Sequence, residues 1–194
     1  DAIQALLNGT PPDSEEIAVV PLADPFPWDW QDDPGATVGV VLYRAQLQAG
    51  DTALAQQLNQ ALRERGLRPG LIWVSSLRDP AVQAGVLDLL RSQGVQVVIT
   101  GTAFASVTTE QAGLGSALWD SLDRPVLQLL TAGTSRERWQ QSSRGLEPLD
   151  LSLQVVMPEL DARVTTRPCA FRQARPPLGG LATAITTQQP DRAG

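Results

Sequence analysis

The chain of 194 residues is long enough for one well-buried domain, and its 42% hydrophobic and 19% charged residues are typical of a globular protein. It contains no histidine, and all 15 basic residues are arginine, which excludes Ser-His-Asp triads, HExxH zinc sites, Schiff-base lysines and Walker A loops. The net charge is −6, and the first 43 residues hold eight acidic residues and no basic one, which argues against a nucleic-acid-binding surface.

Two further features bear on the compartment. No apolar run approaches the ~20 residues that span a bilayer, and no stretch has the pattern of a signal peptide. A single cysteine, Cys169, rules out an internal disulfide framework, so we expect a cytoplasmic protein. We expect Cys169 to be a small packing residue and not a nucleophile.

The first 36 residues are acidic and proline-rich, with the run PFPWDW at 25–30. Residues 1–7 are typical of the end of a helix that stops at Asn8-Gly9, which suggests a segment of a longer protein. We interpret 1–36 as a leader or linker whose aromatic residues attach it to the next domain.

Strands and helices are predicted to alternate after this leader. Short apolar or β-branched runs predict strands at 38–43, 71–74, 95–100 and 126–130. Apolar residues at helical spacing predict helices between residues 52 and 66, at 81–92 and at 116–122. Short connections imply right-handed crossovers. The fold class predicted is α/β: three αβα layers around a mainly parallel sheet, flavodoxin-like or Rossmann-like, with 38–43 as its central strand.

The last third of the chain is less regular. Leu149–Val156 alternates as a strand does, but Pro148 at a first helical position and Asp150 in a first turn favour the short helix that we predict. Extended structure is expected over 163–172 and no regular structure over 174–194. The predicted organisation is a leader over 1–36, an α/β domain over 37–172, and a flexible tail or the start of a further region over 173–194.

A candidate site lies where the strand at 126–130 ends. Thr134 opens the sequence T-S-R-E, which predicts a capping box that includes Glu137. A helix that follows a strand begins at the carboxyl edge of the sheet, where open α/β folds bind ligands. Arginines and Trp139 gather on this helix and just beyond it, and Pro158-Glu159-Leu160-Asp161 follows. Cations, an aromatic ring and two carboxylates predict a site for a large, planar, anionic ligand.

Several motifs share their order with a known family. They are V-G-V-V-L-Y-R at 38–44, A-G-D-T at 49–52, V-S-S-L at 74–77, S-R-E-x-W at 135–139, S-S-R-G-L-x-P-x-D-L at 142–151 and M-P-E-L-D-x-R-V at 157–164. Over residues 36–172 the set resembles the large subunit of ATP-dependent cobaltochelatase, and the P-E-L-D part is similar to the magnesium chelatase large subunit. Two positions depart: Gln46 stands where histidine is expected, and Ala162 where glycine is usual.

The resemblance implies a segment of the large, tetrapyrrole-binding subunit of a cobaltochelatase. Such a subunit inserts Co²⁺ into a corrinoid precursor, hydrogenobyrinic acid a,c-diamide, in cobalamin biosynthesis. AAA+ ATPase and adaptor subunits would be its partners and would hydrolyse the ATP, so the isolated segment is expected to be inactive. One alternative is insertion of Mg²⁺ into protoporphyrin IX in the chlorophyll pathway. Another is a non-catalytic α/β ligand-binding or docking domain.

Glu159 is the predicted catalytic residue. Metal insertion removes two inner N–H protons from the ring, which is a task for a positioned carboxylate base. With Asp161, Glu159 is also the predicted ligand of the incoming Co²⁺ or Mg²⁺, since carboxylate oxygens bind such ions, and the resemblance places the P-E-L-D glutamate at the tetrapyrrole site. The alternative is that Glu159 caps backbone amides while Asp161 pairs with Arg163.

Four residues are predicted to bind the substrate. Arg44, Arg136 and Arg144 would receive carboxylates on the periphery of the ring, because guanidinium groups bind carboxylates bidentately. Trp139 would stack on the ring. The alternative is that the arginines are solvated and that Trp139 is a packing residue.

Overall fold

The structure is a computed structural model that describes residues 35–103, 117–143, 145–175 and 185–191. The predicted leader up to residue 34, the predicted substrate ligand Arg144, and residues 176–184 and 192–194 of the predicted tail lie outside the described residues. The division into leader, domain and tail stays a prediction. Within the described residues, no helix is long and apolar enough to cross a membrane.

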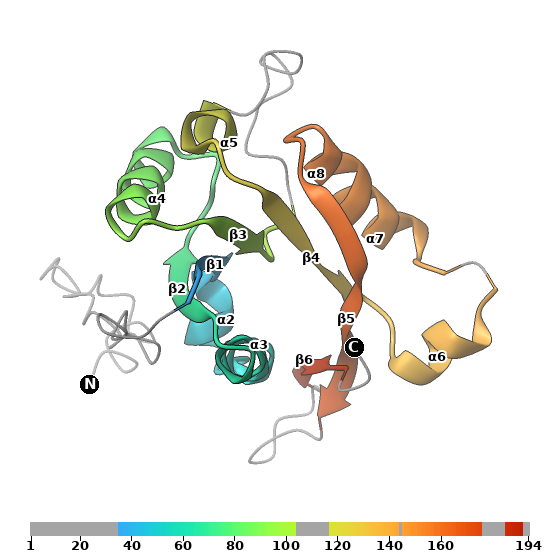
Figure 1. The fold of residues 1–194 in the computed structure, drawn as a ribbon. Helices are drawn as coiled ribbons and strands as arrows, with labels where there is room; N and C mark the ends of the chain where they lie inside the picture. Colours follow the sequence, from blue (N-terminus) through green and yellow to red (C-terminus); the bar gives the residue numbers. More distant parts are fainter. Residues whose placement is uncertain (1–34, 104–116, 144, 176–184, 192–194) are drawn as a thin grey trace, which may run out of the picture.

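Strands and helices alternate along most of the chain (Figure 1). The strands are β1 (Thr37–Tyr43), β2 (Arg68–Val74), β3 (Val97–Thr100), β4 (Val126–Ala132), β5 (Val164–Arg175) and β6 (Ile185–Pro190). The helices are α2 (Arg44–Gln48), α3 (Ala53–Glu64), α4 (Pro80–Ser92), α5 (Ala117–Leu122), α6 (Arg136–Gln141), α7 (Pro148–Leu151), the π-helical turn η1 (Ser152–Val156) and α8 (Met157–Glu159).

The six strands form one sheet in the order β2-β1-β3-β4-β5-β6. The first five are parallel, and β6 runs antiparallel to β5. The order 2-1-3-4-5 is that of flavodoxin-like sheets. Strand β1 is interior, since it pairs with β2 on one side and β3 on the other, and its residues from Thr37 to Leu42 are buried. The prediction of an α/β fold with a mainly parallel sheet is confirmed.

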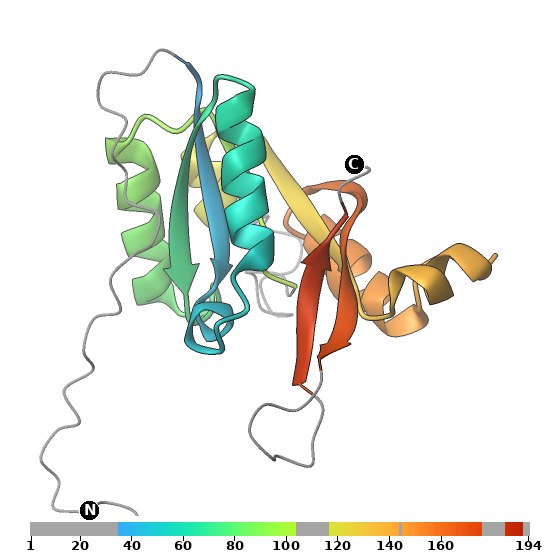
Figure 2. The same ribbon diagram turned by 90° about the horizontal axis from the view of Figure 1, so that it is seen from below.

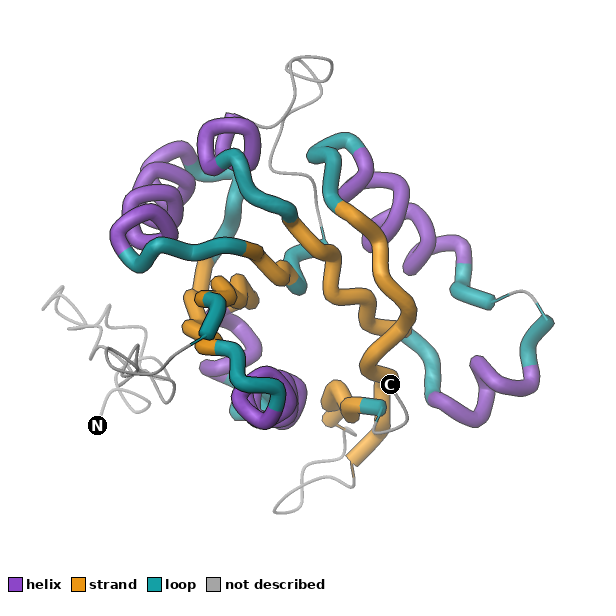
Figure 3. The backbone as a smooth tube through the Cα atoms, viewed as in Figure 1, coloured by secondary structure: helices purple, strands orange, loops and turns teal. Residues whose placement is uncertain are grey.

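Helices cover both faces of the sheet, as Figures 2 and 3 show. On one face Val41 and Val98 pack with α4 and α5, and on the other Val38, Val40 and Leu42 pack with α3. This division follows from the strand period of two. Gly39 lies in β1 because a Cβ there would come within 2.5 Å of Leu90 Cδ2 on α4.

Two local predictions need correction. The cap of α6 is Ser135, whose side chain accepts from Arg138 N at 3.3 Å, and not Thr134. The absence of regular structure predicted from residue 174 is wrong for Ala174 and Arg175, which end β5, and for Ile185–Pro190, which forms β6. Its Thr- and Gln-rich sequence has no apolar alternation, and the strand forms because it pairs with β5.

The helix predicted near 149–156 is confirmed, and it is longer than expected. Helices α7, η1 and α8 follow without a break from Pro148 to Glu159. Pro148 occupies a first helical position and Asp150 the first turn, as predicted. The helix ends at the turn that leads into β5.

Candidate functional site

A pocket of about 360 Å³ with a mixed polar and apolar lining lies at the carboxyl edge of the sheet. Its lining comes from the ends of β1, β3 and β4, from the helix that begins at Pro148, and from β6; it includes Tyr43, Gln46, Gly101, Ala103, Thr131, Asp150, Gln154, Arg172 and Gln188. Chain order reverses at this point, because β1 leads to β2 on one side while β3 lies on the other. Such a switch point is where open α/β sheets bind ligands.

Hydrogen bonds between distant segments form one wall of this pocket. The Tyr43 hydroxyl accepts from Ala103 N at 3.1 Å, which joins the ends of β1 and β3. Gln46 Nε2 donates to Gln188 Oε1 at 3.1 Å, and both carboxylate oxygens of Asp51 accept from Gln188 N at 3.1 Å. The residues that follow β1 therefore hold β6 in place.

The opposite wall is fixed by the helix that begins at Pro148. Asp150 Oδ2 accepts from Gly133 N at 2.7 Å. A Cβ at Gly133 would lie 2.8 Å from Asp150 Oδ1, so a larger residue there would displace the Asp150 carboxylate. In the π-helical turn, Gln154 Oε1 accepts from Thr131 N at 2.8 Å, and Gln154 Nε2 donates to Thr131 O. The Gln154 amide thus satisfies the backbone at the end of β4.

The pocket carries one cation whose charge is not paired by the described residues. The backbone of Arg172 donates to Thr134 O at 3.0 Å, but no ion pair or hydrogen bond within the described residues involves its guanidinium. Of the two acids that line this pocket, Asp150 bonds Gly133 and Glu147 lies 3.5 Å from Arg138 at the surface. Arg172 is therefore placed to receive an anionic group.

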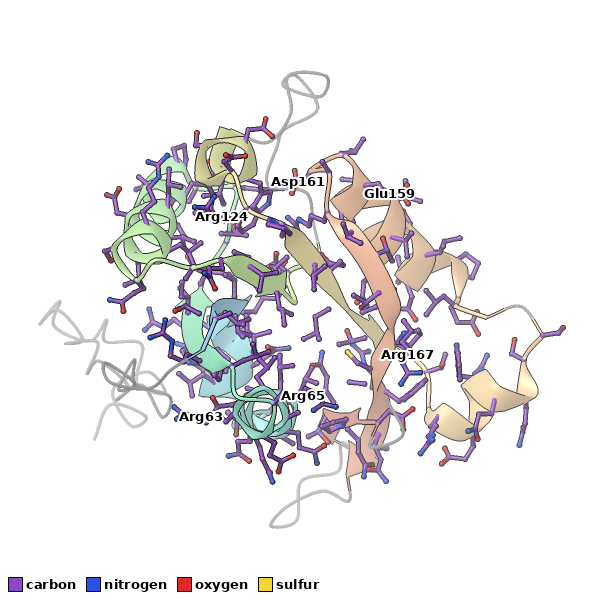
Figure 4. All side chains as sticks on the ribbon, viewed as in Figure 1. Arg63, Arg65, Arg124, Glu159, Asp161 and Arg167 are labelled. Atoms are coloured by element: carbon purple, nitrogen blue, oxygen red, sulfur yellow. The ribbon has the colours of Figure 1, made fainter. Side chains whose placement is uncertain are left out.

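The predicted catalytic residue Glu159 lies elsewhere. It ends helix α8 and is exposed, and it does not line the pocket. Figure 4 shows it beside the turn into β5. Glu159 follows Gln154, the last helical residue of the pocket lining, by five positions, which corresponds to about 8 Å along the axis. No described hydrogen bond involves its carboxylate, so the alternative of a structural cap gains no support; the catalytic and metal-binding roles stay predictions.

Asp161 forms a buried ion pair with Arg163, as the alternative interpretation predicted. Both side chains are fully buried. Arg163 Nη1 also donates to Thr102 O at 2.9 Å and to Gln128 Oε1 at 3.0 Å, and the guanidinium lies 5.7 Å from the Trp119 ring centroid. Burial lowers the pKa of Arg163, and the Asp161 charge opposes this shift. The buried ion pair thus has a structural role: it joins the start of β5 to the residues that follow β3.

The described residues contain no group of three or more His, Cys, Asp or Glu side chains placed to hold a metal ion. The metal-binding role predicted for Asp161 therefore rests on the sequence alone. Burial raises the pKa of the Cys169 thiol to about 11, and the thiol donates to Leu130 O at 3.2 Å. A thiol that stays protonated at neutral pH is a poor nucleophile, in agreement with a packing role.

The predicted substrate ligands do not gather at one point. Arg44 is half-buried at the start of α2. Arg136 pairs with Asp191 at 3.0 Å, and the Trp139 ring packs on Phe171 with centroids 5.3 Å apart. These contacts fit the alternative of surface and packing roles for Arg136 and Trp139. None of the three lines the pocket.

Sequence reasoning missed the residues that do line it. Gln46 follows β1 by three positions, so its place at the carboxyl edge was a usable signal. Asp150 was recognised only as a first-turn acid of a helix. Gln188 and Arg172 had no local signal, because their place depends on the pairing of β6 with β5.

Comparisons with known proteins point in one direction. The family model described as CobN/Magnesium Chelatase matches residues 12–193. The chain is similar to "Aerobic cobaltochelatase subunit CobN" of Sinorhizobium sp, with 38% identity over 139 residues, and to the protein of the same name from Pseudomonas aeruginosa, with 35% over 144 residues. These matches cover 71% and 74% of this chain but 11% of each relative.

A solved structure has a similar fold. It is the "Catalytic Subunit of Cobaltochelatase from Mycobacterium tuberculosis", which is 27% identical, with a TM-score of 0.71. The match covers 89% of this chain and 14% of that one. The similarity thus includes nearly the whole chain but only a small part of each larger protein.

Proposed function

This chain belongs to the CobN/magnesium chelatase family, and on that premise we propose that it is a segment of the large subunit of an ATP-dependent cobaltochelatase. The reaction inserts Co²⁺ into hydrogenobyrinic acid a,c-diamide and releases two protons from the inner nitrogens of the ring. The cobalt assignment is supported by the names of the two relatives that are 38% and 35% identical to the chain.

The observation that carries this proposal is the pocket that Arg172 lines at the carboxyl edge of the sheet. Its volume of about 360 Å³ is at the low end of the ~300–1,000 Å³ of ligand sites, so it suits one edge of a macrocycle. Corrinoids carry carboxylates on the periphery of the ring, and an arginine binds a carboxylate through two parallel hydrogen bonds. The segment would then hold the periphery of the ring.

Metal delivery is a separate claim. Glu159 has the exposed carboxylate that could hold Co²⁺ and accept a pyrrole proton. It lies outside the pocket lining, about 8 Å along the helix from Gln154, so the two claims need independent tests. ATP hydrolysis would fall to AAA+ partner subunits, because this chain has no lysine for a phosphate-binding loop.

Ring binding is tested by titration of the natural polypeptide that carries this chain, with tryptophan fluorescence as the signal. We expect hydrogenobyrinic acid a,c-diamide to quench the emission. Arg172→Met should weaken binding by about 10- to 100-fold, because a hydrogen-bonded charge pair contributes about 1.5–3 kcal/mol. Arg124→Met is the matched control, since Arg124 is an exposed arginine two positions before β4 (Figure 4).

Protoporphyrin IX in the same titration tests the magnesium alternative. Tighter binding of protoporphyrin than of the corrinoid would favour insertion of Mg²⁺. Unchanged fluorescence with both rings would contradict the chelatase proposal and favour a docking domain.

One observation favours that docking alternative. Leu149, Val156 and Leu160 are 68%, 50% and 49% exposed along the helix that begins at Pro148. Apolar residues at this spacing form a stripe that suits a protein contact. Polar substitution of Val156 and Leu160, neither of which lines the pocket, would abolish the function of a docking domain while leaving the ring affinity of the natural polypeptide unchanged.

A further inference from the structure

We propose that Gln46 and Gln188 form a recognition site for a primary carboxamide, beside Arg172, which takes a carboxylate. This inference rests on the proposed function, since the ligand is the amidated corrinoid. It adds to that function the recognition of the carboxamide, which is the group that distinguishes the amidated ring from the corresponding acid.

The geometry of the pair brings two distant segments together. Gln46 belongs to α2, directly after β1, whereas Gln188 belongs to β6, and the two are separated by 142 positions. Both side chains are half-buried, and their amides are joined by one hydrogen bond of 3.1 Å. Both residues line the pocket.

Strand register places the cation next to this pair. Arg172 of β5 is directly opposite Gln188 of β6. Residues opposite each other in an antiparallel pair have Cβ atoms about 4.5–5.5 Å apart on the same face. Asp51 holds the backbone of Gln188 through both carboxylate oxygens, so the strand position does not depend on the glutamine side chain.

The remaining hydrogen-bonding capacity fits a carboxamide. A pair of amides joined by one N–H···O bond leaves one carbonyl oxygen and one NH₂ group, whichever way each amide is oriented. Within the described residues no other hydrogen bond involves these two side chains. A primary carboxamide supplies the complementary NH₂ and C=O. A carboxylate offers acceptors only, so it would place an oxygen against the glutamine oxygen, which would have no donor.

The third amide of the pocket does not compete for this role. Gln154 is occupied by Thr131, to whose backbone and hydroxyl it bonds. The alternative for Gln46 and Gln188 is a purely structural tie between α2 and β6. Such a tie would affect every ligand equally, so the two possibilities differ in what they predict about ligand preference.

The test compares two ligands that differ only in the two amides: hydrogenobyrinic acid a,c-diamide and hydrogenobyrinic acid. Their dissociation constants are measured with the natural polypeptide that carries this chain and with Gln46→Met and Gln188→Met, which keep side-chain volume. Each substitution should shift the ratio of the two constants by about 10-fold toward the acid, because a neutral hydrogen bond contributes about 1 kcal/mol and an unsatisfied partner adds to the loss. Gln56→Met, at an exposed glutamine of α3, should leave the ratio unchanged.

Each outcome decides. An unchanged ratio in both Met variants, with or without a fall in both affinities, overturns the carboxamide site and leaves a structural tie. Binding of neither ligand by the unsubstituted polypeptide overturns the proposed function together with this inference. Arg172→Met provides the complementary result, since it should weaken both ligands and shift their ratio less than the glutamine variants do.

Discussion

Arg163 is the residue on which the interior of the β3–β4–β5 region depends. Its guanidinium is fully buried and is neutralised by Asp161, and Thr102 and Gln128 accept further hydrogen bonds from it. A buried charge is tolerated only when it is paired and hydrogen-bonded. The ion pair therefore constrains the turn before β5 and the loop after β3 at the same time.

We predict that Asp161→Asn lowers the free energy of unfolding by about 3–5 kcal/mol, because it leaves the Arg163 charge buried without its partner. Urea unfolding of the variant would measure the loss. The double variant Asp161→Asn/Arg163→Met should lose less than the single one, since no charge is then left buried. A loss below about 1 kcal/mol for Asp161→Asn would contradict the buried-charge account.

Glu159 presents the opposite situation, an exposed carboxylate without described hydrogen bonds. If it accepts a ring proton, Glu159→Gln should lower cobalt insertion by at least ~100-fold, as loss of a positioned base does. The melting temperature should stay unchanged, because no hydrogen bond or ion pair of this side chain is found among the described residues. Turnover is measured in the complete complex.

Asp88→Asn, at an exposed acid of α4, is the control for this substitution. It should change neither turnover nor melting temperature. Turnover of Glu159→Gln close to that of the control would end the catalytic assignment and leave Glu159 as a solvated surface residue.

Among the elements, the helix that begins at Pro148 and the end of β4 are joined through one side chain. The π-helical turn over Ser152–Val156 contains Gln154, whose amide bonds both backbone groups of Thr131. π-helical turns occur frequently at functional sites. Here the turn places a glutamine where the pairing of β4 with β5 changes register.

We predict that Gln154→Met increases hydrogen exchange at the Thr131 amide by about 10-fold or more, since the amide loses its acceptor and a buried unsatisfied group costs about 1–3 kcal/mol. Amides in β1 should be unaffected. Gln140→Met, at an exposed glutamine of α6, is the matched control. Equal exchange at Thr131 in both variants would show that the Gln154 contact is not formed in solution.

For the whole molecule, the chain spans 11% of the length of the two CobN relatives. A pocket that suits one edge of a macrocycle, with Glu159 outside its lining and about 8 Å along the helix from Gln154, does not by itself surround a ring. Chelatase activity would then require further parts of the large subunit and its partners.

We predict that the isolated 194-residue chain hydrolyses no ATP and inserts no metal. The reason is the absence of lysine and hence of a Walker A loop, together with the small share of the relatives that it covers. Phosphate release and formation of the cobalt corrinoid are measured with and without the partner subunits. Turnover by the chain alone would contradict the division of labour.

The sequence by itself determined the parallel strands up to β4, the helices between them and the absence of lysine and histidine chemistry. These features depend on short apolar runs, helical spacing and caps, which act within about ten residues. The sequence also predicted the helix after Pro148. It predicted the pairing of Asp161 with Arg163 as an alternative to metal binding.

Only the tertiary structure decided which side chains share a site. Glu159 and Arg44 were each predicted as site residues from a local motif. In the structure Glu159 lies at the far end of a helix of twelve residues, outside the pocket. Gln46 and Gln188 are 142 positions apart and meet because β6 pairs with β5. The Thr- and Gln-rich sequence of β6 has no apolar alternation that would predict a strand. Strand pairing and crossover direction are interactions between distant segments, and they are therefore not encoded in any short stretch of the chain.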